Sequence, residues 1–236
     1  MNCKNCDEVV TGKFCSNCGQ SAKISRINWR NFINQVTESV FLVNKGFFYT
    51  LFKLFTKPGQ SIRNYLDGKR KGFYQPIAYV LVLSTFYFLL SQLSDKNTLL
   101  TNILSGFFFD EAKNDTRIVS YLSWVSDHHA YITLLLIPVF SLASFVAFIG
   151  HQVNYLEHLV LNAYVTGQQA IIYALLLPFP EIIPTIIATI YTAWVYWQLF
   201  KNGNRAVNVL KTILTYLIYF ILSFGTLGVI SNWFFL

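Results

Sequence analysis

The sequence predicts an all-α integral membrane protein with about five transmembrane helices, preceded by amphipathic interfacial helices and a small four-cysteine module. Three observations lead to this prediction. Hydrophobic residues make up 54% of the 236 residues and charged residues only 12%, which is about half the charge of an average soluble domain. All four cysteines lie between Cys3 and Cys18. Several later segments reach the roughly 20 apolar residues that a helix needs to cross a bilayer.

The cysteine module occupies residues 1–22. Its pattern is C-x2-C-x8-C-x2-C, formed by Cys3, Cys6, Cys15 and Cys18. Two such pairs are typical of a zinc ribbon, in which four thiolates surround one ion and leave no open position for a substrate. We therefore expect one structural zinc ion per chain, whose binding supplies the folding energy that so small a module lacks. Iron in a rubredoxin-like site and a redox dithiol are the alternatives.

Residues 23–75 predict basic amphipathic helices that lie in the membrane interface. Apolar side chains follow helical spacing over residues 28–56, with lysines between them and an interruption at 44–46. These apolar runs are too short and too charged to cross a bilayer. A soluble helical hairpin packed under the membrane domain is the alternative.

Positive charge is concentrated in the N-terminal third of the chain. Residues 1–75 hold twelve of the 18 lysines and arginines, so we expect this region to contact anionic lipid. Nucleic acid, which would need the same charge, is disfavoured because phenylalanine, leucine and valine alternate with the cations.

Residues 76–236 predict a transmembrane helical bundle. The expected spans cover about residues 76–94, 130–150, 157–177, 182–200 and 209–235. Segments on the N-terminal side of the membrane then hold 15 of the 18 cations, whereas the outer loop 95–129 holds three cations against five acids. Cytoplasmic loops are enriched in Lys and Arg, so we expect a cytosolic N-terminus and a C-terminus outside. Residues 1–23 lack the apolar core of a signal peptide, which agrees with a ribbon in a reducing compartment.

The third predicted span carries a polar stripe at helical spacing. Its members are His151, Asn154, His158, Asn162, Thr166, Gln169 and Tyr173, with Glu157 beside them. Such side chains are costly in hydrocarbon, so the stripe should face the bundle interior or a hydrated cavity. Hydrogen bonds between helices, a ligand or solute site, and catalysis by Glu157 and His158 are the three interpretations. The possible intramembrane site comprises His151, Asn154, Glu157, His158 and Asn162.

The other motifs give only weak evidence for metal binding or catalysis. His128 and His129 beside Asp127 are a weak metal signal, and a solvated loop is the simpler interpretation. The chain contains no P-loop, dinucleotide fingerprint, nucleophile elbow or HExxH motif. An enzyme is therefore the less favoured class.

Several short stretches occur together in a distinctive order. They are Cys15-Ser16-Asn17-Cys18-Gly19-Gln20, Asn44-Lys45-Gly46-Phe47, Pro58-Gly59 with Ile62 and Tyr65, Gly68-Lys69-Arg70 before Tyr74 and Pro76, and Asn154-Tyr155 with Glu157-His158-Leu159-Val160. From residue 1 to about 165 the chain resembles a family of small bacterial multi-spanning membrane proteins of unknown function with an N-terminal zinc ribbon. The resemblance implies the ribbon, an inner-membrane location and a signature Glu157-His158 pair, but no activity.

Three functional hypotheses follow. In the first, the protein is an interaction or regulatory module whose ribbon docks a cytosolic protein while the basic helices hold anionic lipid. In the second, the polar face of the third span conducts a small polar solute or proton. In the third, Glu157 and His158 serve an intramembrane enzyme.

Overall fold

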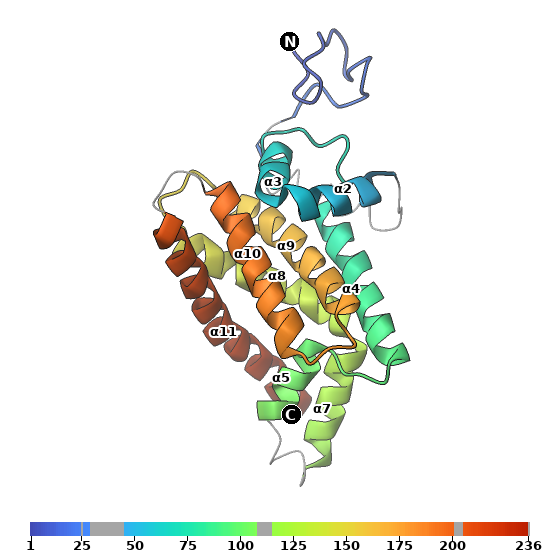
Figure 1. Cartoon of the computed structure of the whole chain (residues 1–236), viewed down its shortest axis with the longest axis vertical. Helices are drawn as coiled ribbons and strands as arrows, with labels where there is room; N and C mark the ends of the chain where they lie inside the picture. The colour runs from blue at the N-terminus through green and yellow to red at the C-terminus, as the bar shows by residue number, and fades with distance from the viewer. Residues whose placement is uncertain (25, 29–44, 108–114, 201–204, 236) are drawn as a thin grey trace.

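The computed structural model describes residues 1–24, 26–28, 45–107, 115–200 and 205–235. Apart from the N-terminal module, which contains two isolated β-bridges, the regular structure in these ranges is helical (Figure 1). The helices are α2 (Lys45–Thr56), α3 (Pro58–Leu66), α4 (Pro76–Leu93), α5 (Leu99–Phe107), α7 (Thr116–Asp127), α8 (His129–Ala147), α9 (Tyr155–Leu175), α10 (Ile182–Leu199) and α11 (Arg205–Phe235). The all-α prediction is confirmed.

Within the described residues, four helices are long and apolar enough to cross a membrane. Their apolar segments are Pro76–Leu93, His129–Ala147, Ile182–Leu199 and Ala206–Thr226. The first three match predicted spans to within a few residues, and the fourth overlaps the predicted span 209–235, which ends like α11 at residue 235. The remaining predicted span corresponds to α9, which has 21 residues but whose histidine, asparagine and glutamines make it less apolar than the other four.

Helix α9 forms the centre of the bundle. It packs against α4, α8 and α10 along its length, and sixteen of its residues are buried. At Gly167 the backbones of α9 and α4 come so close that a Cβ atom would lie 2.7 Å from the Tyr79 ring. By contrast, only 17% of the apolar segment of α11 is buried. The polar side chains of α9 therefore face protein, and the apolar surface of α11 is left for lipid.

Helices α2 and α3 cover one end of the bundle. In Figure 1, α2 lies across the top of α4 instead of continuing its direction. Leu54 is fully buried against the bundle, whereas Phe48 and Phe52 are 59% and 65% exposed. Apolar groups on the outward face, with Lys53 nearby, suit a helix in the membrane interface. The part of the predicted amphipathic segment in residues 29–44 lies outside the described residues.

The segment 95–129 is not simply the loop that the sequence suggested. It contains α5 and α7, which lie at the end of the bundle away from the cysteine module (Figure 1). Leu104, Tyr121 and Val125 pack with Ile132 of α8, so this region has its own apolar core. The sequence does carry a signal for these two helices, because apolar side chains recur at helical spacing in α5 and in α7.

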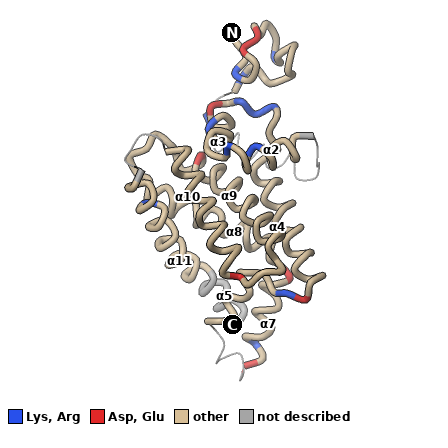
Figure 2. The backbone as a smooth tube through the Cα atoms, in the orientation of Figure 1, with Lys and Arg blue, Asp and Glu red and all other residues tan. Residues whose placement is uncertain are grey.

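Charge separates along the long axis of the molecule. Figure 2 shows Lys and Arg gathered around the cysteine module, α2 and α3, while the opposite end carries mixed charges. The bidentate pair between Arg117 and Asp115, with atoms 2.9 Å apart, belongs to that opposite end. The charge asymmetry counted along the chain is thus also an asymmetry in space.

Candidate functional site

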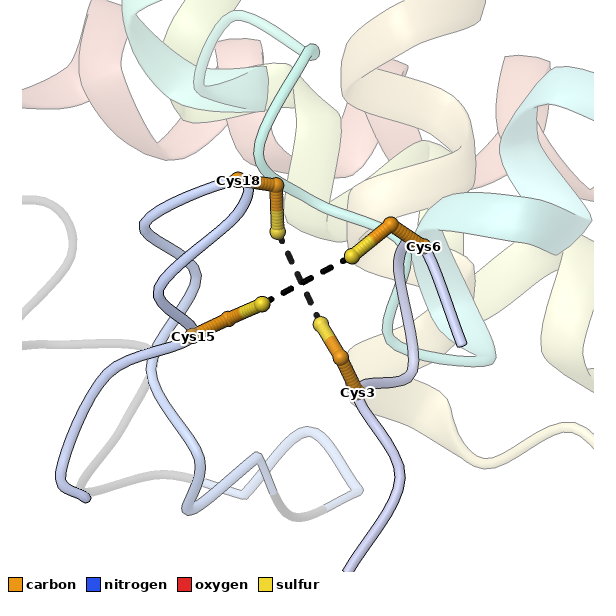
Figure 3. Close-up of side chains that lie close together, drawn as sticks. All are labelled: Cys3, Cys6, Cys15 and Cys18. Carbon is orange, nitrogen blue, oxygen red and sulfur yellow. Dashed lines mark hydrogen bonds between the residues drawn. The ribbon is translucent and has the colours of Figure 1, made fainter. Parts of the chain in front are cut away.

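The four cysteine side chains converge on one point. Their Sγ atoms all lie within 4.8 Å of one another, and Figure 3 shows them pointing inward from two segments of the module. The Cys3–Cys18 and Cys6–Cys15 sulfur pairs are each 3.6 Å apart. A tetrahedral ion with metal–sulfur bonds of about 2.3 Å requires sulfur–sulfur distances of about 3.8 Å. The cluster therefore fits a single metal ion.

The module is built from two equivalent turns that are offset by twelve residues. Cys3 N donates to Glu8 O and Cys15 N to Gln20 O, each at 2.8 Å. Asp7 and Gly19 each have positive φ, at 61° and 70°. Glycine adopts this conformation without strain, and aspartate tolerates it better than most residues. Each turn points its two thiols to the same side, so the paired turns bring all four together.

The thiols of the cluster differ in pKa. A hydrogen bond from the Gln20 backbone lowers the pKa of Cys18 to about 7. The Glu8 backbone also lowers the pKa of Cys6, but desolvation and the other thiols outweigh it and raise that pKa to about 12. Four thiolates this close repel one another, so a cation is needed to hold them all ionised.

Gln20 attaches the cysteine module to the rest of the protein. Its side chain is 4% exposed, and its Oε1 accepts hydrogen bonds from the backbone N–H groups of Arg70 and Lys71 at 3.1 and 3.2 Å. Nothing in the sequence distinguished Gln20 as a docking residue, because its partners lie fifty residues later.

Glu157 pairs with Arg26 at the N-terminus of α9. Arg26 Nε donates to Glu157 Oε1 at 2.6 Å and Arg26 Nη2 to Oε2 at 2.7 Å. The Glu157 side chain is only 7% exposed, and it raises the pKa of Arg26 by hydrogen bonding and by charge. Arg26 also donates to Gln152 O at 2.7 Å. The linker that follows the cysteine module is thereby fixed to the central helix.

Asn154 begins α9 through a capping box. Its side chain accepts from Glu157 N at 2.9 Å, and Glu157 Oε2 accepts from Asn154 N at 2.8 Å. Such reciprocal bonds satisfy two backbone donors that a helix start leaves unpaired. Both carboxylate oxygens of Glu157 are thus engaged, so general acid or base chemistry at this residue would first have to break the Arg26 pair.

His158 and Asn162 face α8 and α10 instead of a solvent path. Both are fully buried. Ser144 Oγ is 2.9 Å from His158 Nδ1 and accepts from Asn162 Nδ2 at 2.7 Å. Tyr196 OH donates to Asn162 Oδ1 at 2.6 Å. A solute passing along this face would have to replace these bonds, so the geometry favours contacts between helices.

Gln169 and Tyr173 continue this pattern. Gln169 Nε2 donates to Thr192 Oγ1 and Tyr216 OH at 2.9 and 3.1 Å, and Tyr173 OH donates to Thr185 Oγ1 at 3.3 Å. The stripe therefore joins α9 to three neighbouring helices, α8, α10 and α11.

His151 stands apart from the other predicted residues. It lies in the turn before α9, and its Nε2 is 3.5 Å from Lys211 Nζ. Partial burial and the charge of Lys211 lower its pKa. It does not join the network of His158 and Asn162.

The outer histidine pair does not form a metal site. His128 Nδ1 lies 2.9 Å from Trp124 O, while His129 begins α8 and is buried against Tyr87. A metal ion would need several His, Cys, Asp or Glu side chains close together. In the described part of the chain, the four cysteines are the only group of three or more such residues.

Comparison with known proteins adds one match. A family described as "Protein of unknown function (DUF3667)" matches residues 44–88, which include α2, α3 and most of α4. No curated protein and no solved structure matches the chain. The match describes no activity, and the resemblance to a multi-spanning family over the rest of the chain stays a prediction.

Proposed function

We propose that this protein is an interaction or regulatory module of the bacterial cytoplasmic membrane, in which a zinc-bound ribbon presents a docking surface to a cytosolic protein. The observation that carries the proposal is the position of the ribbon outside the helix bundle with apolar side chains exposed. Val9 and Phe14 are 61% and 65% exposed. A module this small would gain stability by burying these side chains against a protein partner.

We propose zinc as the ion of this site. Four thiolates in a closed tetrahedron are the usual ligands of structural zinc, and the sulfur positions match that geometry. When bound, the ion would hold the two turns together through Cys3, Cys6, Cys15 and Cys18. Because all four positions are taken by protein, its role would be structural.

The cationic end of the molecule supports a cytosolic ribbon and contact with anionic lipid. Lys and Arg cluster beside α2 and α3 (Figure 2), and cations at the ends of apolar helices generally face the cytoplasm. The exposed Phe48 and Phe52 of α2 would enter the lipid headgroup region while Lys53 and Lys57 meet anionic headgroups. The C-terminus then lies outside if all five long helices cross.

Photocrosslinking in cells tests the docking function. A crosslinking amino acid at Phe14 should give a discrete protein adduct, and Cys15→Ser, which disrupts the metal site, should abolish it. The same crosslinker at Asn17, an exposed polar position of the ribbon, is the matched control and should react much less. Equal adducts at both positions, or adducts that persist in Cys15→Ser, would contradict a ribbon docking surface.

A further inference from the structure

A cavity of about 330 Å³ lies where the ribbon, its linker, α3, the start of α9 and the end of α10 meet. Its polar lining includes Lys4, Arg26, Arg63, Asp67, Gln152 and Glu157. These residues come from four separate segments of the chain, so only the folded protein creates the cavity. Its volume is at the lower end of the range for small-molecule sites, about 300–1,000 Å³.

The lining has unbalanced positive charge. Arg26 and Glu157 neutralise each other in their bidentate pair. Lys4 Nζ donates to Ile24 O at 3.2 Å, and Arg63 donates to Leu199 O. Within the described ranges neither Lys4 nor Arg63 forms an ion pair. Asp67 is the only other acid in the lining, so two cations face one carboxylate.

The surroundings increase this positive potential. The loop after α3 carries Lys69, Arg70 and Lys71 in succession, and it lies at the end of the bundle where cations gather (Figure 2). The guanidinium of Arg63 offers several N–H groups in one plane, which suits the oxygens of a phosphate. The ammonium of Lys4, which lines the same cavity, adds a point charge.

We propose that this cavity binds a phosphate group, carried either by an anionic lipid headgroup or by free phosphate. Lys4 belongs to the ribbon and Arg63 to α3, so the bound group would join the metal module to the helix bundle. The proposal goes beyond protein docking and does not depend on it, because the phosphate site faces the bundle while Val9 and Phe14 are exposed on the ribbon.

Two binding measurements on the full-length, zinc-loaded chain distinguish the sources. Native mass spectrometry in detergent measures retention of phosphatidylglycerol against phosphatidylcholine. Thermal unfolding in rising inorganic phosphate, with chloride at equal ionic strength as the control, measures free-phosphate binding. Retention of phosphatidylglycerol without stabilisation by inorganic phosphate identifies a lipid headgroup site. A rise in melting temperature that is specific to phosphate, together with displacement of the lipid by phosphate, identifies a free-phosphate site.

Charge variants test the cavity itself. Lys4→Gln and Arg63→Gln should each weaken binding about two- to fivefold, the effect of losing one exposed ionic contact. Asp67→Asn should strengthen binding, because it removes the opposing charge. Lys13→Gln, which removes an exposed ribbon lysine outside the cavity, should leave it unchanged. Lys4 is exposed, so its variant stays informative even if Arg63→Gln unfolds α3.

Three results would overturn the proposal. The first is equal retention of the neutral and the anionic lipid without any specific phosphate effect. The second is the same affinity for Lys4→Gln, Asp67→Asn and Lys13→Gln. The third is weaker binding in Asp67→Asn, which would mean that the carboxylate attracts the ligand.

Discussion

Arg26 and Glu157 form a bidentate ion pair between residues 131 positions apart in the sequence, with both N–O distances below 2.8 Å. Glu157 also caps α9, so one carboxylate fixes both the start of the central helix and the linker of the metal module. Glu157 is therefore a structural junction in this fold. Its contacts explain why an acid is accepted at the edge of an apolar bundle.

The ion pair should stabilise the protein more than a surface pair does. Arg26→Gln leaves a mostly buried carboxylate with fewer donors, which should cost about 1–3 kcal/mol of unfolding free energy. Arg117→Gln is the matched control, because its pair with Asp115 has side-chain exposures of 66% and 31% and should contribute less than about 1 kcal/mol. Denaturation in detergent measures both. Equal small losses would contradict a special role for Arg26.

The metal site should contain one zinc ion per chain. Elemental analysis of the purified protein should give a one-to-one ratio, and Cys15→Ser should lose the metal, because three thiolates no longer close the site. Ser16→Ala, an exposed neighbour, should keep it. Iron in place of zinc, or a ribbon that stays folded without any metal, would contradict the assignment.

The buried network of α9 should contribute to the stability of the bundle. Asn162→Ala removes the partner of Tyr196 OH and of Ser144 Oγ, and we expect a loss of about 1–2 kcal/mol, as for other polar contacts between membrane helices. Ser223→Ala is the control, because among the described residues its hydroxyl donates to Phe220 O of its own helix. If Asn162→Ala instead left stability intact and changed solute permeability in vesicles, the solute-path hypothesis would gain support.

The packing of α3 on α10 should not tolerate a side chain at Gly59. A Cβ atom there would lie 2.3 Å from Gln198 Cβ and 2.8 Å from backbone atoms. Gly59→Ala should therefore destabilise the protein by about 1–3 kcal/mol through overpacking. Gly225→Ala meets nothing within 4 Å and should be neutral or slightly stabilising in its helix. Similar melting temperatures for the two variants would show that α3 can move away from α10.

The membrane topology can be read from labelling. Single cysteines at Lys57 and Asn97, in a cysteine-free background, should react with an impermeant reagent from opposite sides, with Asn97 outside. A reporter fused after Leu236 should read outside if α9 crosses together with the four more apolar helices. A reporter that reads inside would show that only four helices cross.

The helices were largely predictable from local patterns. Long apolar runs gave the spans because a bilayer helix must be apolar over a fixed length, and the predicted bounds differ from α4, α8, α9, α10 and α11 by a few residues. The helices α5 and α7 were not predicted, because residues 95–129 were treated only as a charged loop. Apolar residues at helical spacing were nevertheless present there.

The candidate sites differ in how far sequence predicts them. The spacing of Cys3, Cys6, Cys15 and Cys18 predicts convergence because each pair sits in one short turn. The spacing of its polar residues predicted the stripe of α9. His151 does not belong to that stripe, because the helix begins at Tyr155. The roles of the others depended on partners such as Ser144 and Tyr196, which no local spacing reveals.

The sequence alone determined three features: the paired cysteine turns, the apolar helices and the cationic end of the chain. All three depend only on short-range geometry and on the preference of each side chain for water or lipid. Tertiary structure determined which groups meet. Arg26 reaches Glu157, Gln20 reaches the backbone after α3, and Lys4 and Arg63 line one cavity. These contacts require the helices and the ribbon to pack in one arrangement, because hydrogen bonds and ion pairs act only at close range and their partners lie far apart in the sequence.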